Sequence, residues 1–156
     1  MAQPALIAPL SELERKAQRL NQASDSLNLI LSQVEERLVH ANVGVEVWLR
    51  KALASTDSEG STHGETTWSS QFLGFAKLNG RWCLAIKPTR FASGFFEGDT
   101  NSPYQNEYSD GAPIPLSKAS RDLRIAAVEV LPDLINLLAE ETDRCVRTIE
   151  RASDLV

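Results

Sequence analysis

The stretch QFLGFAKLNGRWCLAIK, residues 71–87, decides the fold. Two apolar runs flank its central dipeptide, Asn79-Gly80. This dipeptide between apolar runs is a strong signal for a β-hairpin, because both residues of the turn need a positive φ. A two-residue turn also sets the register and places Leu78 opposite Arg81. The sequence therefore predicts two antiparallel strands joined at this turn.

The predicted register sorts the side chains of the hairpin onto two faces, because strand residues alternate between faces. One face carries large apolar residues, namely Leu73, Phe75, Trp82, Leu84 and Ile86. The other carries mostly small residues, namely Phe72, Gly74, Ala76, Cys83 and Ala85. We expect the large face to pack against helices. The small face admits a second layer or a close ligand, and we favour a thinly covered surface.

A third strand is predicted upstream of the hairpin. Apolar residues alternate with other types over residues 45–50, which is the period of a strand. A polar stretch from Ser55 to Thr67, rich in Ser, Thr and Gly, separates this strand from the hairpin.

The N-terminal part of the chain predicts a long helix. Ser11 and Glu14 form a capping box, whose side chains satisfy the first free amides of a helix. Apolar or small residues then follow at alternating spacings of four and three, namely Leu13, Ala17, Leu20, Ser24, Leu27, Leu31, Val34 and Leu38. We expect this helix to end near His40 and residues 1–10 to form a tail.

A second long helix closes the chain. The same four-three spacing recurs at Val128, Leu131, Ile135, Leu138, Thr142, Cys145, Ile149 and Ala152. Pro132 lies inside this pattern, where it either kinks the helix or starts a new one. The two stripes are complementary if the helices run antiparallel, with Ala17 and Ser24 opposite Thr142 and Cys145.

These elements predict a single α+β domain over residues 11–156: a three-stranded antiparallel sheet packed on a long antiparallel helical hairpin, in the order α-β-β-β-α. This order is similar to that of double-stranded RNA-binding domains, and Lys118-Ala-Ser-Arg121 resembles their basic helix start. The resemblance would imply RNA binding. The first helix is much longer here, the loop before the last helix is acidic, and the usual lysine cluster is missing, so we assign no family.

Composition limits the classes of function. A chain of 156 residues is about one domain, and its net charge of −5 argues against a general polyanion binder. Two cysteines are too few for a disulfide scaffold or a thiolate zinc cage. The first ten residues lack a basic start and contain two prolines, and no long apolar run occurs. We therefore expect a cytoplasmic protein with no membrane segment.

Residues with catalytic chemistry are scarce. His40 falls in the last turn of the first helix, where a cation favours the helix dipole. His63 lies in a polar loop beside Ser and Glu residues, but catalytic triads are recognised by geometry and not by adjacency. Cys83 and Cys145 have no CxxC or Cys-His context, and we interpret both as small apolar residues. We expect no catalytic residue, cofactor or metal.

The segment from Phe91 to Pro115 is the most unusual stretch, because connections this long are usually functional or disordered. It holds five of the ten aromatic residues and no Lys or Arg. Aromatic anchors dominate the energetics of protein interfaces. We therefore predict a surface that binds a basic protein partner, formed by Phe95, Phe96, Glu97, Asp99, Tyr104, Glu107, Tyr108 and Asp110. The alternative is that Phe95 and Phe96 only cover the small face of the sheet.

Charge is uneven along the chain. Residues 44–95 carry six Lys or Arg and four Asp or Glu, whereas residues 96–156 carry six and twelve. The six central cations are Arg50, Lys51, Lys77, Arg81, Lys87 and Arg90. They indicate a basic patch, and a sheet edge protected by lysines explains them equally well.

The leading hypothesis is a small non-catalytic interaction or assembly protein that binds a partner through the aromatic acidic loop and the long helices. A homo-oligomer formed through the helices belongs to this hypothesis, because Leu-rich helices pair between chains as readily as within one. One alternative is nucleic-acid binding through the basic strands, although the overall acidity makes nucleic acid an unexpected partner. Another is a small-molecule enzyme or carrier with a pocket between the sheet and the Phe91–Pro115 loop.

Overall fold

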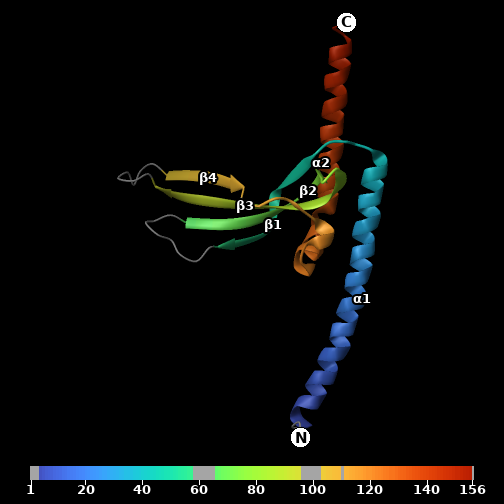
Figure 1. Ribbon diagram of the computed structural model, residues 1–156, viewed down its shortest axis with the longest axis vertical. Helices are drawn as coiled ribbons and strands as arrows, with labels where there is room; N and C mark the ends of the chain where they lie inside the picture. Colours follow the sequence, from blue (N-terminus) through green and yellow to red (C-terminus); the bar gives the residue numbers. More distant parts are fainter. Residues whose placement is uncertain (1–3, 58–65, 96–102, 110, 156) are drawn as a thin grey trace.

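The computed structural model describes residues 4–57, 66–95, 103–109 and 111–155 (Figure 1). The protein is α+β. Its elements follow the order α1 (Pro4–Ala41), β1 (Val47–Asp57), β2 (Thr66–Leu78), β3 (Arg81–Phe95), β4 (Pro103–Ser109), β5 (Ile114–Pro115), the 3-10 turn η1 (Leu116–Lys118) and α2 (Arg121–Ser153). The strands form one antiparallel sheet in the order β1-β2-β3-β4, with β5 added to the outer edge of β3.

The predicted hairpin is confirmed residue by residue. Leu78 pairs with Arg81, and the pairing continues in the same register along the whole length of β2 to Thr66, which pairs with Ser93. Asn79 and Gly80 have φ values of 49° and 80°, which are the positive values that this turn needs. The register therefore places the large and small faces as the sequence predicted.

The sheet has more strands than we expected. The antiparallel sheet that was predicted with three strands is present, and β4 and the short β5 add to β3. Both new strands come from the Phe91–Pro115 segment, which we interpreted as a loop. The physical reason is that β3, without them, has an unpaired row of N–H and C=O groups along its outer edge. Pairing with β4 and β5 satisfies these groups.

The two predicted long helices are present, but they run in the same sense and not antiparallel (Figure 1). Hydrogen bonds join the start of α2 to the middle of α1. Arg121 Nη2 donates to Asn21 Oδ1 at 3.1 Å, and further along both helices Arg124 Nη1 donates to Asn28 Oδ1 at 2.8 Å. Thr142 then lies about 30 Å further along α2, at 1.5 Å per residue, and it cannot face the first turns of α1. The chain passes through β5 and η1 and starts α2 beside the middle of α1. From that point α2 runs in the same direction as α1.

The core lies between the large face of the sheet and the two helices. Leu73, Phe75, Leu84 and Ile86 are buried there, as predicted, and Trp82 is half-buried at the end of the row. The buried residues of α2 are Ala127, Leu131, Leu134 and Leu138. Ile135, which we placed on the buried stripe, is exposed, because α2 turns its Leu134 side toward the sheet.

α1 begins earlier than expected. It starts at Pro4, so residues 4–10, which we interpreted as a tail, are helical, and Pro9 lies inside the helix. At 1.5 Å per residue its 38 residues are about 57 Å long. The half of α1 that contains the N-terminus projects from the sheet in one direction, and the end of α2 projects in the other (Figure 1).

Candidate functional site

The free half of α1, residues 4–23, presents an apolar stripe to solvent. Leu6, Leu10, Leu13 and Leu20 are all exposed, and Leu13 is the most exposed of them at 61%. They continue the four-three spacing of the residues that pack in the core. The stripe becomes buried at Ser24, which is 8% exposed, and Leu31 further along is 6% exposed. The same seam is therefore packed in one half of α1 and uncovered in the other.

The ion pairs of the free half lie outside this stripe. Arg15 Nη2 lies 2.7 Å from Glu12 Oε1, and Lys16 Nζ lies 3.4 Å from the same oxygen. The hydrogen bond from Arg15 lowers the pKa of Glu12 and raises the pKa of Arg15. All three side chains are exposed, so these pairs add little stability. None of the three charged residues belongs to the leucine stripe.

The predicted partner-binding residues are only partly described. Phe96, Glu97, Asp99 and Asp110 lie outside the described residues. Phe95 ends β3, and Tyr104, Glu107 and Tyr108 lie within β4, where they pair with Gly94, Phe91 and Arg90 of β3. The structure thus places four of the predicted residues on one hairpin.

The small face of the sheet carries an aromatic surface that the sequence analysis did not assemble. A hollow of about 400 Å3 on this face is lined by Trp48, Leu49, Arg50, Phe72, Lys87, Thr89 and Phe91. Trp48 comes from β1, and we had assigned the faces only within the hairpin. The alternation over residues 45–50 was the signal that could have placed Trp48 on the small face beside Gly74.

Trp48 is held in place from two sides. Its Nε1 donates to Glu46 Oε1 at 2.8 Å, and its ring lies directly over Gly74. A Cβ built on Gly74 would lie 2.2 Å from Trp48 Cε3, so only glycine lets the ring lie there. Lys87 Nζ sits 4.8 Å from the centre of the same ring, within the range of a cation–π interaction.

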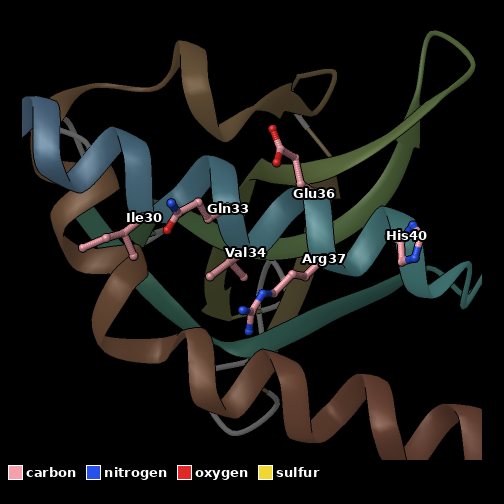
Figure 2. Close-up of a pocket in the computed structure, with 6 residues that line it drawn as sticks. All are labelled: Ile30, Gln33, Val34, Glu36, Arg37 and His40. Carbon is pink, nitrogen blue, oxygen red and sulfur yellow. The ribbon is translucent and has the colours of Figure 1, made fainter.

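A groove of about 730 Å3 runs along α1 and contains His40 (Figure 2). Its lining residues are Ile30, Gln33, Val34, Glu36, Arg37 and His40. In Figure 2 the Glu36 carboxylate points away from Arg37 and Val34. The side chains of Glu36, His40 and Arg37 therefore do not point toward one another.

A smaller pocket of about 250 Å3 lies between α1, β3 and the start of α2. Glu35 Oε2 accepts a hydrogen bond from Leu84 N at 2.8 Å. This bond satisfies an amide of β3 next to the pair of residues that β5 covers. Arg124 Nε is buried and has no hydrogen-bond partner among the described residues. Glu35 is thus a structural acceptor at the sheet edge.

Cys83 and Cys145 are free thiols, and Cys83 is buried as expected for a small apolar residue. Burial raises the pKa of the Cys83 thiol, and the negative charge of Glu35 raises it further. Such a thiol is a poor nucleophile, because the thiolate is the reactive form. His63 lies outside the described residues. Among the residues that are described, no cluster of three His, Cys, Asp or Glu side chains suits a metal ion.

Neither helix, over its described residues, contains a stretch long and apolar enough to span a bilayer. Comparison with known protein families, with characterised proteins and with solved structures finds no match for the chain. The likeness to double-stranded RNA-binding domains rested on an order of elements that β4 and β5 change.

Proposed function

We propose that this protein is a non-catalytic assembly protein that binds a second copy of itself through the free half of α1. The observation that supports the proposal is the exposed leucine stripe at Leu6, Leu10, Leu13 and Leu20. This stripe continues a seam that is already packed against the core from Ser24 onward. Exposed apolar surfaces of this kind mark interaction sites.

Helix stability leads to the same conclusion. Most helical stability in proteins comes from packing of an apolar face, and the free half of α1 leaves its apolar face exposed. Pro9 weakens the free half further, because it cannot donate the backbone hydrogen bond of its position. A partner that covers the stripe supplies the packing that the chain itself does not.

The heptad spacing favours a second copy arranged in parallel and in register. In this register Leu6, Leu13 and Leu20 occupy d positions, Leu10 and Ala17 occupy a positions, and Glu14 and Lys16 flank the seam at e and g. A parallel pair sets Lys16 against Asn21 of the second copy. An antiparallel pair sets the Lys16 side chains of the two copies against each other, and likewise the two Glu14 side chains. Repulsion between these like charges disfavours the antiparallel arrangement.

Cysteine crosslinking tests both the pairing and its direction. In a Cys145→Ser background, Leu20→Cys should form a disulfide-linked dimer under mild oxidation, because d positions meet in a parallel pair. An antiparallel pair would bring Leu20 to Leu10 of the second copy and separate the two introduced thiols by about 15 Å along the helix.

Gln22→Cys is the matched control. Gln22 lies two residues from Leu20 on the outer side of the heptad, so it should not crosslink. The parallel seam would be contradicted if neither variant forms the crosslinked dimer, or if both variants form it to the same extent. A protein that stays monomeric in solution would overturn the proposal of self-assembly.

The β3–β4 hairpin is proposed as a second docking surface for a basic protein partner. Phe95, Phe96, Tyr104 and Tyr108 would anchor the partner, and Glu97, Asp99, Glu107 and Asp110 would select its charge. Replacing Tyr104 and Tyr108 by alanine should then weaken capture of a basic partner while the melting temperature stays nearly constant. A lower melting temperature with intact binding per folded molecule would show that these residues only cover the sheet.

A further inference from the structure

Aromatic rings form a nearly continuous floor across the small face of the sheet. Trp68 stacks on Phe91 with ring centres 5.4 Å apart, and Phe72 meets Phe91 edge to face at 6.2 Å. Trp48 lines the same hollow as Phe72 and Phe91. All four rings are half-buried, so part of each ring stays open to solvent. Both helices pack on the opposite face, where the large apolar residues form the core.

The three strands that carry these rings are rich in cations. Strands β1, β2 and β3 carry six Lys or Arg residues and a single acid, Asp57, although the whole chain is acidic. None of the six cations forms an ion pair within the described part of the chain. Arg50 and Lys87 line the aromatic hollow itself. Acids flank this surface as well, because Glu46 accepts a hydrogen bond from Trp48 Nε1 and Glu107 pairs with Phe91 in the β3–β4 register.

We propose that this surface binds single-stranded nucleic acid. Aromatic rings stack with bases of any sequence, and a positive groove attracts the phosphate backbone. Phe72 and Phe91 would stack with bases, while Arg50 and Lys87 would contact phosphates. Base pairing hides the faces of the bases inside a duplex, so single strands should bind better than double strands. The inference concerns the sheet and is independent of the assembly through α1.

The overall charge of −5 argues against general polyanion binding, but it does not oppose a local site. Phosphates respond to nearby charges, because interactions beyond about 8 Å are screened at physiological ionic strength. The expected affinity is nevertheless modest and dependent on salt. Each phosphate contact adds about 0.7 to the slope of log affinity against log salt for a single strand. Two contacts predict a contribution of about 1.4 to this slope.

Fluorescence anisotropy with labelled oligonucleotides of about 12 residues tests the proposal directly, since sites of this kind cover about 4–16 nucleotides. The probes are oligo-dT, oligo-rU and a DNA duplex of the same length, each titrated at about 50 and 200 mM salt. We expect both single strands to bind more tightly than the duplex. A difference between the DNA and RNA arms would report a contact to the 2′-hydroxyl.

A charge-reversed double variant, Arg50→Glu with Lys87→Glu, should weaken binding about tenfold or more and reduce the salt slope by about 1.4. The matched control is Lys77→Glu with Arg90→Glu. It changes the net charge by the same amount, but both residues lie at positions of the opposite face by strand alternation. We expect the control to weaken binding less than about threefold, because the altered charges lie across the sheet from the hollow.

A stacking variant, Phe91→Leu, keeps an apolar side chain and should weaken binding about fivefold or more while the net charge is unchanged. Circular dichroism and thermal melting verify that each variant is folded. The proposal is overturned if neither single strand binds at the lower salt, if the duplex binds as tightly as the single strands, or if both charge variants weaken binding equally.

Discussion

The apolar stripe of α1 allows one substitution to be compared in two environments. Leu31 and Leu13 belong to the same stripe, but Leu31 is 6% exposed and Leu13 is 61% exposed. Leu31 packs in the core with Leu84 and Leu131. Leu31→Ala therefore removes buried methylene groups and leaves a cavity, which should lower the free energy of unfolding by about 2–5 kcal/mol. Leu13→Ala should lower it by less than about 0.5 kcal/mol when the protein is dilute enough to be monomeric.

Urea denaturation at two protein concentrations measures this contrast. In the dilute samples only Leu31→Ala should shift the midpoint. In the concentrated samples Leu13→Ala should also lose stability relative to the wild type, because assembly stabilises the folded state by mass action. The reasoning is refuted if Leu13→Ala costs as much as Leu31→Ala at low concentration, since the free half would then pack within the chain. It is refuted equally if Leu31→Ala costs less than about 0.5 kcal/mol.

Three further predictions concern the sheet. Gly80→Val should lower the free energy of unfolding by about 1–2 kcal/mol, because a β-branched residue must then hold the φ of 80° at the hairpin turn. An unchanged urea midpoint would show that the strands are joined by another turn. Gly74→Ala should displace the Trp48 ring, alter tryptophan emission and cost about 1–3 kcal/mol, whereas unchanged emission would mean that the ring does not lie on Gly74. The raised pKa of Cys83 means that the folded state holds its thiol proton more tightly, so stability should fall as the pH rises above the ordinary thiol pKa of about 8.5. Cys83→Ala should remove this dependence of stability on pH. Glu35→Gln should lower the pKa of Cys83 and speed the reaction of its thiol with a thiol reagent. Equal reaction rates in the wild type and in Glu35→Gln would contradict the role of Glu35.

The hairpin was predictable because its information is local. Asn79 and Gly80 determine the turn, the turn determines the register, and the register determines which apolar residues meet the helices. The register alone predicted which residues of β2 and β3 are buried in the core. The same holds for the long helices, whose four-three spacing is visible without any tertiary contact.

The direction of α2 was not predictable, because it depends on contacts between distant residues. The two stripes are complementary if the helices run antiparallel, but the Arg121–Asn21 and Arg124–Asn28 hydrogen bonds show that the helices run in the same sense. β4 was missed for a related reason. Its sequence, PYQNEYS, lacks an apolar alternation, and its pairing depends on the free edge of β3. The aromatic floor was missed because its rings come from three strands.

Sedimentation velocity of the full chain tests the central claim most directly. The wild type should sediment as a dimer with twice the monomer mass of 17.2 kDa, and the triple variant Leu10→Ser, Leu13→Ser, Leu20→Ser should sediment as a folded monomer. These three leucines are exposed, so their replacement should leave the melting temperature of the dilute protein nearly unchanged. A wild type that stays monomeric as its concentration rises, or a triple variant that remains dimeric, would contradict assembly through α1.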